Sequence, residues 1–237
     1  TTTTTNVHTR TGGTAEDPTI AGGNQTTTTG NVISLDLNTP TEFTPAKAGA
    51  EFQVNAYTSG DQDQPAITML LDGGFVASWT QGSTAIIGRR FDASGDATSD
   101  DFQINTTVAN VAEPKVTTLS DGGFFVSWYG GSGTDYNVYG QRYNASGESV
   151  GSEIIINSTT GDTQAGTAVT SLNDGSIVVT WHGRAGGSGG ASYEIYGQRF
   201  DNLGSALGSE FIVNSTTSGD QLNPSVTAMS DGGFLIG

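Results

Sequence analysis

The sequence predicts an all-β fold, a propeller-like array of about three and a half four-stranded repeats behind a Thr-rich segment. The first observation is a phrase that places an Asp seven residues before a Trp. Its copies are Asp72 to Trp79, Asp121 to Trp128, Asp174 to Trp181, and an incomplete fourth that opens at Asp231. The second is an acid-apolar-x-apolar-Asn motif whose Asn recurs at intervals of 50, 52 and 57 residues. Four short strands fit into such a period, as in a propeller blade.

The composition agrees with a turn-rich β protein and excludes several classes of function. Hydrophobic residues make up only 34% of the chain, and 35 residues are Gly, which short strands and tight turns require. The net charge of −16 opposes binding to nucleic acid, whose phosphates need clustered Lys and Arg, but suits divalent cations. The chain has no Cys, so disulfides and thiolate chemistry are excluded. No apolar run approaches the ~18 residues of a transmembrane segment.

Two regions follow each other along the chain. Residues 1–48 are Thr/Gly-rich tracts that we expect to form a low-complexity linker or extended segment, with one possible strand at Asn31–Leu37. Residues 49–237 form the β-repeat domain, which we expect to be truncated at its C-terminal end. We therefore expect the remainder of a longer parent chain, with a large aromatic residue directly after Gly237, or identical subunits, as partners.

Four strand motifs recur in fixed order within the repeat domain. The second and third are joined by an Asp-Gly pair, which predicts a two-residue hairpin with positive φ at both central residues. An Asn/Asp-x-x-Gly turn joins the fourth motif to the next copy of the first. The copies of the acid-to-Asn first motif are 51–55, 101–105, 153–157 and 210–214, and those of the fourth are 86–91, 138–143 and 195–200.

Two sets of repeated side chains have a structural interpretation. The strands that end in Trp79, Trp128 and Trp181 are apolar on both faces, so we expect these Trp side chains to wedge between neighbouring sheets rather than stack on a ligand. The repeated basic residues, Arg90, Arg142 and Arg199, should each pair with a repeated carboxylate, from either a Gly-Asp loop or the Asp-Gly hairpin. The functional alternative is a ring of Arg that reads sugar acids or sulfate.

The candidates for chemistry are weaker. Asp61, Asp162 and Asp220 follow a Gly in the loop before the second motif, where each could bind Ca²⁺ or cap the loop. No catalytic residue is assigned, because no nucleophile elbow accompanies His8 or His182 and no pair of acids stands apart from the turns. The only irregular polar spot is His182-Gly-Arg184. We therefore expect a protein that is not an enzyme.

The repeated phrase G-D-Q-x-x-P-x-V-T-x-L-x-D-G-G-F-x-V-S-W, with I-Y-G-Q-R-F and G-x-E-F-x-V-N, resembles repeats of very large secreted bacterial proteins. These are the calcium-associated exoproteins of the repeats-in-toxin (RTX) type and surface-layer or adhesin-like chains. The family's calcium-binding nonapeptide is absent, so the resemblance does not assign calcium ligands. It implies secretion, a bacterial cell-surface location and the presentation of binding surfaces.

The resulting prediction is a non-enzymatic structural or adhesive module of a larger extracellular bacterial surface protein. One alternative is a glycan-binding, lectin-like propeller that contacts cell-surface glycans, and another is a non-catalytic accessory domain of a secreted enzyme. Exposed aromatic residues at equal positions in successive repeats would favour the lectin. Counted from the Trp of each repeat, Tyr129, Tyr136 and Tyr193 fall at unequal offsets, which counts against it.

Overall fold

The computed structural model describes residues 51–184 and 192–237. The compact unit that contains all the repeats runs from Phe52 to Gly237. In this part of the chain every regular element is a β-strand. The extended segment expected at 1–48, with its possible strand at Asn31–Leu37, lies outside the described residues.

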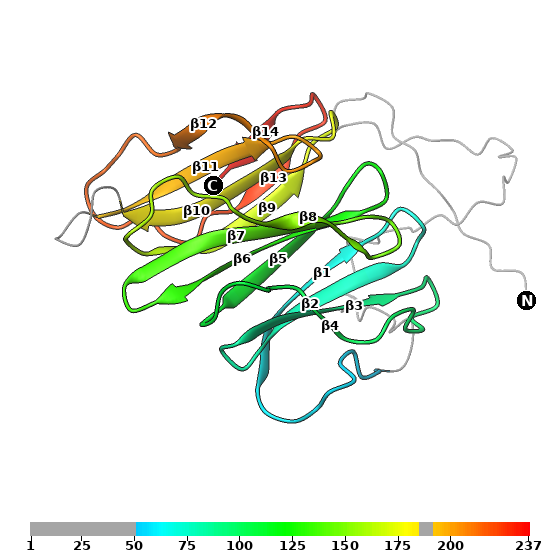
Figure 1. Ribbon diagram of the computed structural model, residues 1–237. Coiled ribbons are helices and arrows are strands. Elements are labelled where there is room, and N and C mark those ends of the chain that lie inside the picture. The colour runs from blue at the N-terminus through cyan, green and yellow to red at the C-terminus, as the bar shows by residue number, and fades with distance from the viewer. Residues whose placement is uncertain (1–50, 185–191) are drawn as a thin grey trace, which may run out of the picture. The chain divides into compact units, whose positions relative to one another are not determined.

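The strands form three four-stranded antiparallel sheets and one hairpin, and each sheet follows the order of the chain (Figure 1). Sheet 1 contains β1 (Gln62–Met69), β2 (Phe75–Gln81), β3 (Ala85–Phe91) and β4 (Phe102–Gln103). Sheet 2 contains β5 (Ala112–Thr118), β6 (Phe124–Ser132), β7 (Asp135–Tyr143) and β8 (Ser149–Ile155). Sheet 3 contains β9 (Gln164–Ser171), β10 (Ile177–Arg184), β11 (Tyr193–Phe200) and β12 (Ala206–Ile212), and the hairpin pairs β13 (Val226–Ala228) with β14 (Phe234–Ile236).

The sheets stack in a propeller-like manner. Their first strands lie beside one another in succession, β1 against β5, β5 against β9, and β9 against β13. The described sheets do not close into a ring (Figure 1). The all-β class and the four-stranded repeat predicted from the sequence are therefore confirmed, whereas a closed propeller is not observed.

Each sheet is built from the second, third and fourth motifs and the next copy of the first. The first motif at 101–105 supplies β4, and its copies at 153–157 and 210–214 contribute to β8 and β12. The copy at 51–55 does not form a strand, because the described residues offer no sheet in front of it to pair with. Its Val54 nevertheless packs against a buried cluster of sheet 1 that includes Trp79 and Phe91.

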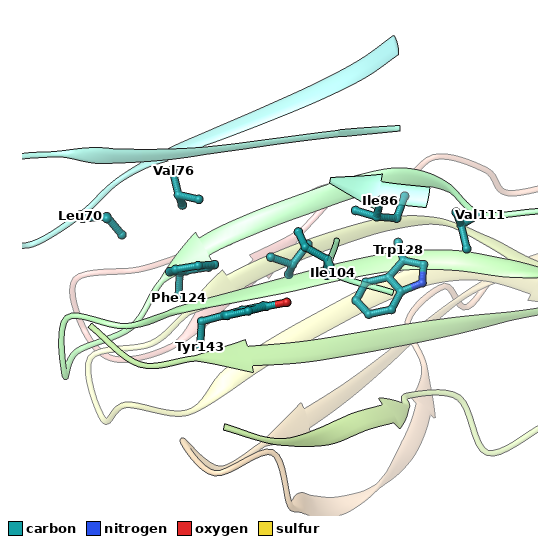
Figure 2. Close-up of a cluster of buried hydrophobic side chains, with 9 residues drawn as sticks. Leu70, Val76, Ile86, Ile104, Val111, Phe124, Trp128 and Tyr143 are labelled. Carbon is teal, nitrogen blue, oxygen red and sulfur yellow. The ribbon is translucent and has the colours of Figure 1, made fainter. Parts of the chain in front are cut away.

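The hydrophobic core lies between the sheets. The cluster in Figure 2 joins Leu70, Val76, Ile86 and Ile104 of the first repeat to Val111, Phe124, Val126, Trp128 and Tyr143 of the second. An equivalent cluster joins sheets 2 and 3 around Trp181. Trp128 and Trp181 are fully buried in clusters shared by two sheets, as expected of wedges, whereas Trp79 is nearly buried in a cluster formed by sheet 1 and Val54. Burial of each such side chain contributes about 1.5–3 kcal/mol.

The Asp-Gly hairpins differ from the predicted two-residue turn. In the first, the N–H of Leu70 donates to the carbonyl of Gly74 at 2.8 Å, so the loop contains three residues. Gly73 has a φ of 87°, whereas Asp72 is not among the described residues with positive φ. The reason is that Asp72 Oδ1 accepts the N–H of Gly74 at 2.9 Å, an Asx-turn contact made two residues further on. The remaining hairpins repeat this contact from Asp121, Asp174 and Asp231.

Candidate functional site

The repeated Arg side chains pair with the hairpin Asp of their own sheet. Nη2 of Arg90 lies 3.2 Å from Oδ2 of Asp72, and the Arg199–Asp174 distance is 3.0 Å. Arg142 makes the same ion pair with Asp121. Of the two predicted partners, the hairpin Asp is therefore the one used. A ring of Arg available to sulfate or sugar acids is not formed, since each guanidinium is already paired.

The first motif also has a structural role. Its acid accepts backbone N–H groups from the loop of the preceding repeat, as Glu153 does from Thr106 at 2.8 Å and Glu210 from Ser158 at 2.7 Å. Its Asn accepts a backbone N–H from the third strand of its own sheet, at 2.7 Å between Asn105 and Ile86. These contacts explain why the motif keeps its spacing while the connecting loops vary.

The three Asp residues proposed as metal ligands lie in separate loops and do not converge. Asp61 is exposed, and Asp220 Oδ1 accepts the N–H of Tyr193 at 3.1 Å. Asp162 differs, because it is only 3% exposed and its Oδ2 has no hydrogen-bond partner. The described residues contain no group of three His, Cys, Asp or Glu that could hold a metal ion. Asp162 is thus the one position of the three with a buried oxygen left to receive a cation.

A backbone irregularity lies eight residues before the hairpin Asp of each repeat, within β1, β5 and β9 and just before β13. The residues there have positive φ, 52° at Gln64, 53° at Glu113, 62° at Gly166 and 55° at Asn223. The strand pairing shifts register at this point in each of the three full sheets. Such bulges re-aim side chains. The backbone conformation at this position is therefore the same in each repeat, while its side chain differs from one repeat to the next.

Hydrogen bonds at the bulges join neighbouring sheets. Gln64 Oε1 accepts the N–H of Glu113 at 2.9 Å, and it also accepts the hydroxyl of Thr80 at 3.0 Å. Further along, Nδ1 of His182 accepts the N–H of Asn223 at 3.3 Å. In these contacts, residues at the bulge positions bond either to each other or to the residue that follows a repeat's Trp.

Two edge-to-face aromatic pairs lie beside these bulges in sheets 2 and 3. The rings of Tyr129 and Tyr136 are 5.8 Å apart at 71°, and those of His182 and Tyr193 are 5.3 Å apart at 86°. Tyr129 and His182 each follow the repeat's Trp, and all four residues are partly exposed. Sheet 1 has Thr80 at the first of these positions.

The structure corrects the view that these Tyr residues are unmatched. Tyr136 and Tyr193 both lie four residues before the Gly of the fourth motif, so they are repeat-equivalent. Counting from the Trp obscured this equivalence, because the connection between the second and third strands is longer in sheet 3. Repeated aromatic residues therefore support the lectin-like alternative.

Arg184 adds an unpaired cation to the second aromatic pair. It lies opposite Tyr193 in the β10–β11 pairing, with its guanidinium carbon 4.3 Å from the centroid of the Tyr193 ring. The repeat-equivalent residues are Gly82 and Gly131. Its Nε is buried without a hydrogen-bond partner, and it forms no ion pair with any residue the structure describes.

We name the aromatic patch as Glu113, Tyr129 and Tyr136 of sheet 2 with His182, Arg184 and Tyr193 of sheet 3. The chain at Gly166–Thr167 joins its halves. A Cβ at Gly166 would lie 2.3 Å from Nδ1 of His182, and the Thr167 hydroxyl donates to the carbonyl of Glu113 at 3.5 Å. Sequence reasoning identified His182 and Arg184 as irregular but missed Glu113. The signal available was departure from the repeat at a bulge position.

Protonation in the patch follows from burial. Desolvation lowers the pKa of His182 below its ordinary value, so the ring is neutral at pH 7. Since Nδ1 accepts a hydrogen bond, the proton of the neutral ring is on Nε2. Burial, followed by the charges of Glu113 and Tyr136, raises the pKa of Tyr129. The patch therefore presents hydroxyl, imidazole N–H and guanidinium donors together with one carboxylate.

Two hollows lie outside the patch. One, of about 620 Å³, is lined by residues including Asn214, Gln221 and Asn223, and it adjoins the patch because Asn223 bonds to His182. The other, of about 520 Å³, lies along β4 and β8. Its Glu153 and Gln103 already bind loop backbone. The second hollow thus has a structural explanation for its polar side chains.

No protein-family model and no curated protein matches this sequence. Several solved structures are similar in fold. An N-acetylgalactosamine deacetylase from F. plautii, in complex with blood group B trisaccharide, matches at a TM-score of 0.50 and 10% identity over 77% of this chain and 63% of its own. An endo-arabinase from Bacteroides thetaiotaomicron matches at 0.49 and 16%, covering 78% and 73%. A xylan beta-1,4-xylosidase from Bacillus halodurans matches at 0.47 and 16%, covering 77% and 38%.

These comparisons correct the expectation that the chain is not an enzyme. The deacetylase, which is named as an enzyme, shares the fold of this chain, and the chain spans less than two thirds of the deacetylase's length. The structural roles of the repeated residues therefore do not exclude catalysis, because a protein's function depends on the site that its fold carries. Within residues 51–184 and 192–237, no helix is long and apolar enough to cross a membrane.

Proposed function

We propose that this chain binds carbohydrate through the aromatic patch. The observation that supports this proposal is the pair of repeat-equivalent ring contacts, Tyr129–Tyr136 and His182–Tyr193, on two adjacent sheets. Aromatic rings offer apolar faces to the C–H faces of sugars, while their polar tips remain available for hydrogen bonds. A few convergent polar groups beside such rings are the usual composition of a small-molecule site.

The scaffold suits this function. The Arg–Asp ion pairs and the Asn contacts hold the strands, so the patch residues vary without disturbing the repeat. The acidic surface is compatible with neutral glycans, which carry no charge to be repelled. The proposal places the chain in a secreted or cell-surface bacterial protein, as the RTX-type resemblance implies. Its partners would be surface glycans and either further repeats of a parent chain or identical subunits.

Calcium enters the proposal only at Asp162. Its buried, unpartnered Oδ2 is the kind of oxygen that Ca²⁺ accepts as a ligand, with backbone carbonyls and water completing the shell. A bound ion there would stiffen the loop between β8 and β9.

The test is a glycan-array screen of the wild-type chain, followed by calorimetric titration with the glycans that bind. Tyr136→Ala and Tyr193→Ala should each weaken binding by roughly tenfold, by analogy with other ring-stacking contacts. Tyr57→Ala is the matched control, because Tyr57 is exposed and lies outside the patch. Binding that both patch variants retain at full strength would place the site elsewhere, and an array without hits would refute the proposal.

The same glycans should be incubated with the protein and followed for new reducing ends and released acetate. Turnover would show that the patch belongs to a catalytic site. In that case Glu113→Gln should abolish product formation while binding persists, because Glu113 is the patch's only carboxylate.

A further inference from the structure

We propose that Arg184, Tyr193 and His182 form a subsite for the carboxylate of an acidic sugar, a hexuronate residue of the bound glycan. This inference rests on the proposed carbohydrate function and specifies its ligand. It concerns the half of the patch on sheet 3, where His182 and Arg184 depart from the residues at the same positions of the other repeats.

Arg184 differs from every other described arginine in having no carboxylate partner. Arg89, Arg90, Arg142 and Arg199 each form an ion pair with an Asp. In a chain with 24 acidic and 8 basic residues, an arginine without a partner is the exception. Its Nε is buried without a hydrogen-bond partner, as it is in Arg90, Arg142 and Arg199, so what distinguishes Arg184 is that its outer N–H groups have no carboxylate partner among the described residues. A ligand oxygen is the natural acceptor for these outer N–H groups.

The geometry holds the guanidinium in place. The centroid of the Tyr193 ring lies 4.3 Å from the guanidinium carbon, and the rings of Tyr193 and His182 are in an edge-to-face contact. Gly166 is required for this arrangement, because a side chain there would collide with the imidazole. A planar guanidinium stacked on a ring presents its N–H groups outward in a fork that matches the two oxygens of a carboxylate.

His182 supplies a second donor of fixed direction. Its Nδ1 is occupied by the N–H of Asn223, which leaves the Nε2–H to face a ligand. The nearby acids are already engaged, Asp220 with the N–H of Tyr193 and Glu194 with the side chain of Asn214. Arg184 and His182 therefore supply the donors of the subsite, while these two carboxylates each accept a hydrogen bond from the protein.

The overall charge of −16 limits the ligand to a short acidic segment. At physiological salt the Debye length is about 8 Å, so a single uronate at Arg184 responds to its local partners and hardly to distant carboxylates. A long polyuronate would place many charges against the acidic surface. The expected ligand is therefore a glycan with isolated uronate residues or a short uronate oligomer.

The test compares trigalacturonate with its methyl ester, which removes the charge and keeps the sugar, by calorimetric titration. The wild type should bind the free acid more tightly than the ester. Arg184→Gln should weaken binding of the acid by roughly tenfold or more, the usual value of a charge-assisted hydrogen bond, and change the ester by less than about twofold. Arg199→Gln is the matched control, because Arg199 lies in the same sheet but pairs with Asp174. Circular dichroism of each variant establishes that it is folded.

The outcomes separate this inference from the proposed function. Equal binding of acid and ester, or equal loss of both in Arg184→Gln, overturns the uronate subsite while carbohydrate binding stands. Preference for a sulfated trisaccharide over trigalacturonate overturns the carboxylate assignment. Binding of neutral glycans alone does the same. Absence of binding to any glycan overturns both the subsite and the function on which it rests.

Discussion

Replacing Trp128 by Ala should destabilise the protein more than the same change at Trp79, although the two residues occupy one position of the repeat. Trp128 is fully buried within a cluster to which two sheets contribute side chains, so its removal leaves a cavity that neither sheet can close. Large-to-small changes of this kind cost about 3–5 kcal/mol, a large part of the 5–15 kcal/mol that holds a typical domain together. Trp79 packs in a smaller cluster of sheet 1 and Val54, and the segment at Val54 is not part of a strand, so the space left by Trp79 can close more easily. We expect about 2–3 kcal/mol there.

The measurement is urea unfolding followed by far-ultraviolet circular dichroism, since each substitution removes one of the three Trp residues and so changes the fluorescence signal. Neither Trp128 nor Trp79 has a partner for its indole N–H, so the comparison contains no hydrogen-bond difference. An equal or larger loss for Trp79→Ala, or a loss below about 1 kcal/mol for Trp128→Ala, would contradict the view that the sheets are held by these wedges. Trp181 provides an internal check, because it does donate, to Gln164 at 3.1 Å. Trp181→Phe should therefore cost about 1–3 kcal/mol more than Trp128→Phe.

Three further predictions concern charge. Arg142→Met should destabilise by about 1–3 kcal/mol and Arg199→Met by less than about 1 kcal/mol in the same assay, because the Arg142 side chain is 8% exposed and that of Arg199 is 36%; the reverse order would contradict a burial-dependent pair. Burial holds the pKa of His182 below its unfolded value, so the unfolded chain binds the extra proton first and stability should fall as pH drops below about 6.5. Melting temperatures of the wild type and His182→Gln should differ in slope across that window, and parallel curves would refute the assignment. Removing calcium with a chelator should lower the melting temperature of the wild type but leave that of Asp162→Asn unchanged; an equal response in both would exclude Asp162 as the ligand.

Local patterns in the sequence were sufficient to predict the repeat. The strand motifs, the turns that join them and the buried Trp positions depend on side-chain spacing and turn chemistry, which act over a few residues. The Arg–Asp pairing was also predictable, although the choice between two candidate Asp residues depended on strand register. The hairpin type was predicted wrongly, because the hydrogen bond from the Asp side chain outweighs the general preference of Asp-Gly for a two-residue turn.

The site depended on contacts that sequence spacing does not encode. Tyr136 and Tyr193 are equivalent when counted back from the Gly of the fourth motif, and only the count forward from the Trp, across loops of unequal length, obscured this. Glu113 joined the patch because it lies at a backbone bulge beside Tyr129, and such a bulge has no residue signature strong enough to identify it in advance. The sequence alone determined the scaffold, since repetition makes each strand motif visible several times. Only the tertiary structure determined that Arg184 has no acidic partner within residues 51–184 and 192–237, because pairing is a matter of distance across strands.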